Sequence, residues 1–110
     1  MTTTGWLDTL PRLRAYRSKR CSSFDRSGGN ADFIRQQPGT TLTLADIPGA
    51  GCIKHIWMTL GTDEPAFPRR LILRAWWDGE TTPSIEAPIG DFFGLGHGLI
   101  KNFVSGPLQM

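Results

Sequence analysis

Glycine and proline interrupt this chain so often that no long helix can run without being broken. The 110 residues include 13 Gly and 8 Pro, well above the roughly 12% that these two residues make up in average chains. Glycine adopts unusual backbone angles at little cost and proline lacks an N–H donor, so both favour turns. A helical bundle is therefore excluded, and a single domain of short elements joined by turns is expected.

Between the turns, several stretches have the alternating or β-branched character of strands. The predicted strands are 40–46, 52–60, 71–77, 84–87 and 102–105. Asp78-Gly79 predicts a turn after the third strand, and the glycines of 91–98 predict irregular structure there. Short strands separated by turns are typical of a β-sandwich, so the fold class is expected to be all-β.

The first twenty residues are distinctly basic. Residues 1–20 carry a net charge of +4 and residues 21–110 a net charge of −2. Apolar residues at steps of three, limited by Pro11, predict a short helix over 11–17 or a turn-rich strap. We therefore divide the chain into a basic N-terminal strap, 1–20, and a sandwich domain, 21–110. The strap is either a solvated face or a segment that wraps a neighbouring subunit through its arginines.

Several functional classes find no support in the sequence. The net charge of +2 is too small to indicate a nucleic-acid-binding protein. There is no secretory signal and no apolar run of the ~18 residues that a membrane span needs, so we expect no membrane contact and a cytoplasmic location. Cys21 and Cys52 lack the spacing of a zinc site and are expected to be buried free thiols. The Gly94-Leu-Gly-His-Gly98 run lacks the spacing of a phosphate loop, and no cofactor is expected.

Aromatic and acidic side chains raise the possibility of a carbohydrate site, in which rings stack on sugars and carboxylates bind hydroxyls. Trp57 is either such a ring or ordinary core. His55 is either an acid–base group or a hydrogen-bonded structural residue. Glu80 and Glu86 could form a glycosidase pair, yet their positions suit solvated turn residues equally well, and we do not expect them to be catalytic.

A glycine-rich loop in the first third of the chain groups four polar residues, Asp25, Arg26, Asn30 and Asp32. Their oxygen atoms could ligate a cation or a set of polyol hydroxyls. Alternatively, the aspartate and asparagine side chains close local turns and have no ligand.

Three phrases of the sequence occur together in one known family. They are Ser22-Ser-Phe-Asp-Arg-Ser-Gly-Gly-Asn30 with Asp32, Gly51-Cys-Ile-Lys-His-Ile-Trp-Met-Thr59, and Trp77-Asp-Gly-Glu80 continuing to Pro83-Ser-Ile-Glu-Ala-Pro-Ile-Gly-Asp-Phe-Phe-Gly94. In this order they resemble the N-terminal part of the domain of unknown function 2961, glycoside hydrolase family 172. The resemblance implies a jelly-roll β-sandwich, assembly into trimers or larger forms, and anomer-retaining action on fructofuranosides or arabinofuranosides by two glutamates.

The family places those glutamates downstream of the Gly-Asp-Phe-Phe-Gly phrase, in sequence that this chain does not contain. The resemblance therefore implies an incomplete jelly roll that is inactive alone and whose catalytic residues are unknown. Carried over residue by residue, it marks eight positions as sugar-binding or fold-defining: Asp25, Arg26, Asn30, Asp32, His55, Trp57, Asp91 and Phe92. The expected partners are a furanoside-containing glycan and further copies of the chain, and the alternative function is a non-catalytic carbohydrate-binding or oligomerisation module.

Overall fold

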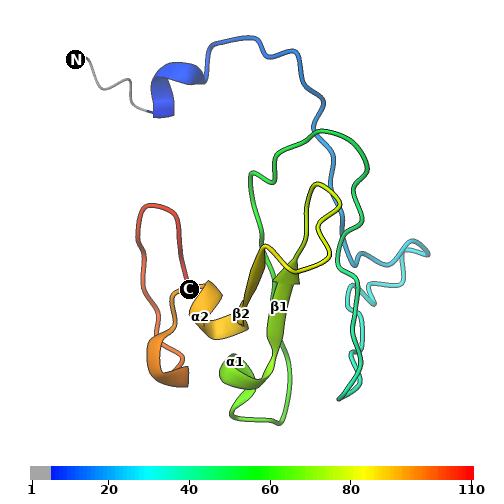
Figure 1. Cartoon of the computed structure of the whole chain (residues 1–110), viewed down its shortest axis with the longest axis vertical. Coiled ribbons are helices and arrows are strands. Elements are labelled where there is room, and N and C mark those ends of the chain that lie inside the picture. The colour runs from blue at the N-terminus through cyan, green and yellow to red at the C-terminus, as the bar shows by residue number, and fades with distance from the viewer. Residues whose placement is uncertain (1–5) are drawn as a thin grey trace. The chain divides into compact units, whose positions relative to one another are not determined.

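The computed structural model describes residues 6–110 (Figure 1). The chain divides into two units, Met1–Cys52 and Ile53–Met110. In the first unit, the regular element of the described residues is the 3-10 helix η1, Trp6–Thr9. The second unit contains helix α1 (Phe67–Arg70), strands β1 (Ile72–Ala75) and β2 (Ile85–Pro88), helix α2 (Ile89–Phe92) and the 3-10 helix η2 (Gly96–Gly98).

The prediction of an all-β, jelly-roll-like sandwich is wrong. Within residues 6–110 there is one sheet, and it consists of β1 and β2 alone. A sandwich needs two sheets whose inner faces cover each other, whereas no strand is assigned at 40–46 or at 52–60. The predicted strand 102–105 is reduced to a single bridge between Val104 and Gln109. The result is a small mixed structure with little regular backbone.

The predicted helix over 11–17 is also absent, because the helical turn lies before Pro11. The Leu10 N–H donates to the Leu7 carbonyl over 3.1 Å and the Arg12 N–H donates to the Thr9 carbonyl over 3.2 Å. The first bond closes a turn before Pro11 and the second a turn that contains it, after which the backbone is irregular. The side chain of Leu13 is fully exposed, so no apolar contact supports a helix that is too short to be stable in water by itself.

Cys21 and Cys52 are exposed thiols, which corrects the expectation that both are buried. The predicted sandwich does not form, so no second sheet covers the two cysteines. The thiols are exposed for that reason.

The hairpin of β1 and β2 confirms the central parts of two predicted strands. The strands are antiparallel, with Ile72 opposite Pro88 and Ala75 opposite Ile85. The predicted Asp78-Gly79 turn is confirmed as well: the two residues have φ of 54° and 73°, and the Glu80 N–H donates to the Trp77 carbonyl over 3.1 Å. Positive φ at both central positions is the geometry of the tight turn that matches the strand twist.

Helices form where the glycines predicted irregular structure. The Ile89 N–H donates to the Leu71 carbonyl over 2.7 Å, which joins the start of α2 to the segment that connects α1 with β1. Figure 1 shows both helices at the same end of the hairpin. Ile89 and Leu95 are each 4% exposed and Pro68 is buried, so the core of the second unit lies between these helices.

Gly90 allows α1 and α2 to approach closely. A Cβ atom at Gly90 would lie 2.7 Å from the Cβ of Pro68 and 2.9 Å from its carbonyl oxygen. Both distances are shorter than van der Waals contact for a Cβ atom, so any side chain at position 90 would push the helices apart. Pro68 itself is favoured in the first turn of α1, where no N–H is needed.

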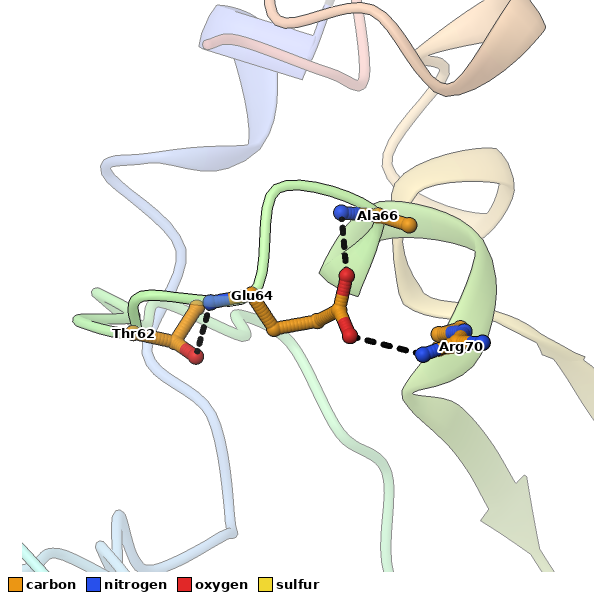
Figure 2. A network of polar contacts seen from close by, with 4 residues as sticks. All are labelled: Thr62, Glu64, Ala66 and Arg70. Carbon is orange, nitrogen blue, oxygen red and sulfur yellow. Dashed lines mark hydrogen bonds and ion pairs between the residues drawn. The ribbon is translucent and has the colours of Figure 1, made fainter.

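The carboxylate of Glu64 caps the start of α1 (Figure 2). One oxygen accepts the Ala66 N–H over 2.9 Å and the other accepts Nη1 of Arg70 over 2.7 Å. The Ala66 N–H first, and the Arg70 guanidinium second, hold the pKa of Glu64 below its ordinary value. Thr62 closes the preceding turn by accepting the Glu64 N–H over 3.1 Å. Ala66 occupies the N-cap position but has no polar side chain, so Glu64 supplies the capping hydrogen bond instead.

Replacing Gly90 with alanine is expected to destabilise the second unit by about 1–3 kcal/mol, because the added methyl group overlaps Pro68. Chemical denaturation followed by tryptophan fluorescence measures the free energy of unfolding. Gly61→Ala is the matched control, since a Cβ at Gly61 meets no atom within 4 Å. Equal stability of the two variants would show that the close approach of the helices is unimportant.

Glu64→Gln is expected to lower stability at neutral pH and to matter less in acid. Because the folded state lowers the pKa of Glu64, the unfolded chain binds a proton first as the pH falls. The stabilisation from Glu64 is therefore complete above the unfolded pKa and is lost from about pH 5 downward. Thermal unfolding from pH 7 to pH 3 should show the two proteins converging. The exposed neighbour Asp63 provides the control Asp63→Asn, and a difference that persists undiminished at pH 3 would contradict the capping role.

Candidate functional site

The polar loop of the first unit is built around the carboxylate of Asp25. Its Oδ1 accepts the N–H and the hydroxyl of Ser27 over 2.9 and 2.7 Å, and its Oδ2 accepts the Ala31 N–H over 3.2 Å. The Ser27 hydroxyl first, then the backbone N–H groups of Ser27 and Ala31, keep the pKa of Asp25 below its ordinary value. Asp25 is thus a charged hub whose oxygens are occupied by the loop itself.

Asp32 joins the two arms of this loop. Its Oδ1 accepts the Asp25 N–H over 2.7 Å, and its backbone carbonyl accepts the Ser23 hydroxyl over 3.1 Å. Asn30 has a φ of 59°, a left-handed conformation that asparagine tolerates better than most residues. The structure therefore brings together three of the predicted loop residues, Asp25, Asn30 and Asp32, and gives the two aspartates contacts of the local-turn kind.

Arg26, the fourth predicted loop residue, stacks on an aromatic ring. Its guanidinium carbon lies 5.3 Å from the centre of the Phe24 ring, and Arg35 lies 5.1 Å from the centre of the Phe33 ring in the same way. Both distances are within the range of cation–π attraction. The sequence analysis missed Phe24, Phe33 and Arg35. Their signal is the repeated Phe-x-Arg spacing, which the sequence shows at 24–26 and 33–35.

The second unit contains an open groove of about 750 Å³. His55 and Trp57 line it from the irregular stretch before α1, Phe93 and Leu95 line it from the region of α2, and Gln109 lines it from the C-terminal segment. Trp57 is 75% exposed. The volume is within the usual range of small-molecule sites, and the lining combines rings and apolar side chains with imidazole and amide groups.

Asp91 and Phe92 lie on α2, whose other residues Ile89 and Gly90 line the groove. Asp91 Oδ1 accepts Nη1 of Arg69 over 2.8 Å. A Cβ at Gly98 would lie 2.9 Å from Cγ of Arg69, so the same arginine packs on η2 and pairs with α2. Phe92 meets Phe93 edge to face, with ring centres 5.1 Å apart. Arg69, like Phe24, Phe33 and Arg35, was not identified from the sequence.

Comparison with known proteins gives one family match. The profile of the family described as GH172 domain-like matches residues 30–106. The chain belongs to the GH172 domain-like family. The resemblance predicted from the sequence is thereby confirmed, and the chain is a glycoside hydrolase-related module. Searches of curated proteins and of solved structures found no match.

The matched region of this GH172 domain-like chain covers six of the eight predicted site residues, while Asp25 and Arg26 precede it. Among residues 6–110 no three His, Cys, Asp or Glu side chains gather in a way that could hold a metal ion. In the same part of the chain no helix has the length and apolar character to cross a membrane.

Most acidic side chains of Ile53–Met110 form an ion pair or a hydrogen bond with another side chain of that unit. Glu64, Glu86 and Asp91 form ion pairs with Arg70, Arg74 and Arg69 respectively. Glu80 accepts a hydrogen bond from the Ser84 hydroxyl. Each of these contacts ties the carboxyl group to another part of the same unit. These side chains are therefore suited to holding the fold together.

Asp25→Ala is expected to open the polar loop, because the Ser27 and Ala31 N–H groups lose their acceptor. Hydrogen exchange followed by NMR should show these two amides exchanging at least about tenfold faster. Asp46→Ala, an exposed aspartate of the same unit, is the control. Unchanged protection of Ser27 and Ala31 in the Asp25 variant would mean that the backbone holds the loop without the carboxylate.

Proposed function

We propose that this GH172 domain-like chain binds furanoside-containing glycans in the groove of Ile53–Met110 and supplies substrate contacts to a retaining furanosidase. The observation that carries the proposal is the exposed ring of Trp57 in the wall of a groove of about 750 Å³, in a chain of a glycoside hydrolase-related family. An exposed indole ring beside a hollow is available to stack on the apolar face of a sugar.

The chemistry of the groove suits a sugar. A furanose ring offers apolar C–H groups on its faces and hydroxyl groups around its edge, so it needs both kinds of contact. Trp57 and Phe93 provide ring surfaces, and His55 and Gln109 provide hydrogen-bonding groups. Concave sites of this kind use apolar surface for affinity and a few polar groups for orientation. His55 and Trp57 are thus assigned to substrate binding.

Bond cleavage is assigned to groups other than the ion-paired carboxylates. A retaining glycosidase needs two carboxyl groups about 5 Å apart, one of them able to donate a proton. Glu64, Glu86 and Asp91 are each ion-paired with an arginine, and in this proposal they serve as structural groups. In this proposal the chain by itself does not release sugar from nitrophenyl arabinofuranoside or fructofuranoside.

Trp57→Ala is expected to weaken binding of an arabinofuranosyl or fructofuranosyl oligosaccharide about tenfold, since the loss of one ring contact is worth roughly 1.4 kcal/mol. Isothermal titration calorimetry measures the affinity. Trp76→Ala is the matched control, because Trp76 is also an exposed tryptophan of this unit but does not line the groove.

Equal effects of the two tryptophan substitutions, or sugar release by the purified chain, would contradict the proposal. The alternative is an oligomerisation module, which the many exposed apolar side chains of the described residues favour. In that case Trp57→Ala would leave sugar binding unchanged and reduce the mass in solution measured by light scattering.

A further inference from the structure

Each of the two Phe-x-Arg pairs of the first unit places a guanidinium group over a phenyl ring. Within residues 6–110 the ion pairs involve Arg69, Arg70 and Arg74, so neither Arg26 nor Arg35 has a carboxylate partner there. Each instead lies over its own phenylalanine, at 5.3 and 5.1 Å from the ring centre. A cation held this way keeps its N–H groups available for a ligand.

The neighbouring aspartates form no ion pair with these arginines within residues 6–110. Asp25 accepts the N–H and hydroxyl of Ser27, and Asp32 accepts the Asp25 N–H. Their oxygen atoms accept hydrogen bonds from backbone N–H and hydroxyl donors, which closes the loop. The loop therefore uses its carboxylates for its own hydrogen bonds, while its guanidinium groups lie over exposed rings.

The loop also keeps the two pairs on adjacent arms. Ser23 and Asp25, the neighbours of Phe24 in sequence, both donate hydrogen bonds to Asp32, and Phe33 follows Asp32 directly. Phe24 is 47% and Phe33 58% exposed. Two aromatic faces and two cations thus flank one hydrogen-bonded junction.

We propose that this loop binds an oxyanion carried by a saccharide, either the carboxylate of a uronic acid or a phosphate ester. The planar fork of arginine matches both groups with two parallel hydrogen bonds. A phenyl ring beneath the fork limits its motion and lowers the entropy lost on binding. The exposed ring faces are available to the C–H groups of the sugar. The choice of a saccharide as the carrier rests on the proposed function, whereas the anion site rests on the loop alone.

The test is an NMR titration of the full chain with three probes: a galacturonic acid trisaccharide, arabinose 5-phosphate and a neutral arabinofuranosyl trisaccharide. The first two should shift the amide signals of 22–36, and the neutral sugar should not. The double variant R26Q/R35Q should weaken binding of the anionic probes by about tenfold or more, since a hydrogen bond to a charged group is worth at least that factor. The double variant R14Q/R17Q, which removes two exposed cations of the same unit, should bind as the wild type does. The two anionic probes distinguish the carboxylate source from the phosphate source.

Two further variants separate this site from general charge attraction. R26K/R35K keeps the charge but loses the fork, and F24L/F33L keeps the guanidinium groups but loses the rings; both should weaken binding. Full binding by R26K/R35K, equal binding of the neutral sugar, or a loss of affinity in R14Q/R17Q as large as in R26Q/R35Q would overturn the proposal. Tighter binding of a single-stranded oligonucleotide, with a steep salt dependence, would overturn it in favour of nucleic acid. Trp57→Ala should leave the anion response unchanged, so failure of the groove proposal and failure of this one give different results.

Discussion

The contact between Gly90 and Pro68 is the constraint on which the second unit depends. The backbone of α2 touches the proline of α1 because position 90 has no side chain. From that contact the Ile89 N–H reaches the Leu71 carbonyl and the Leu95 N–H reaches the Gly90 carbonyl. Both bonds tie α2 to its surroundings and bury Ile89 and Leu95. The same packing positions the apolar part of the groove wall, so the shape of the candidate site follows from the absence of one methyl group.

The sequence predicted features of this fold that depend on a few adjacent residues. Asp78-Gly79 turns the chain as expected because both residues tolerate positive φ, a purely local preference. The alternation along β1 is likewise local: Leu73 and Ala75 are less exposed than Ile72 and Arg74. Neither prediction required knowledge of what packs against the strand.

Features that depend on distant partners could not be predicted in the same way. The glycines of 91–98 indicated irregular structure, yet the end of α2 and the whole of η2 lie in this range. Helix α2 packs on α1 because the missing Cβ of Gly90 allows a contact with Pro68, 22 positions earlier. The alternation in 40–46 indicated a strand, yet a strand requires a pairing partner that no described residue provides. A pattern of side chains shows which face could be buried, but it does not show whether another surface covers that face.

The candidate sites were predictable to a similar extent. The polar loop and the His55–Trp57 stretch were recognised from residue type, which is a local property. The stacking of Arg26 and Arg35 was not recognised, although the Phe-x-Arg repeat was visible in the sequence. The pairing of Asp91 with Arg69 joins residues on two helices, and no spacing rule connects them. Sequence reasoning therefore found the groups that could contact a ligand better than it found the groups that hold them in place.

Arginines have opposite roles in the two units, and this difference bears on function. Arg69, Arg70 and Arg74 form ion pairs with carboxylates and connect helices, strands and the turn before α1. Arg26 and Arg35 rest on rings, while the aspartates beside them bind backbone N–H groups. The second unit thus uses its charges to hold an apolar groove in shape, and the first unit leaves cations available to a ligand. This division of roles agrees with the proposed function, in which the chain contributes contacts to a substrate and its ion-paired carboxylates serve the fold.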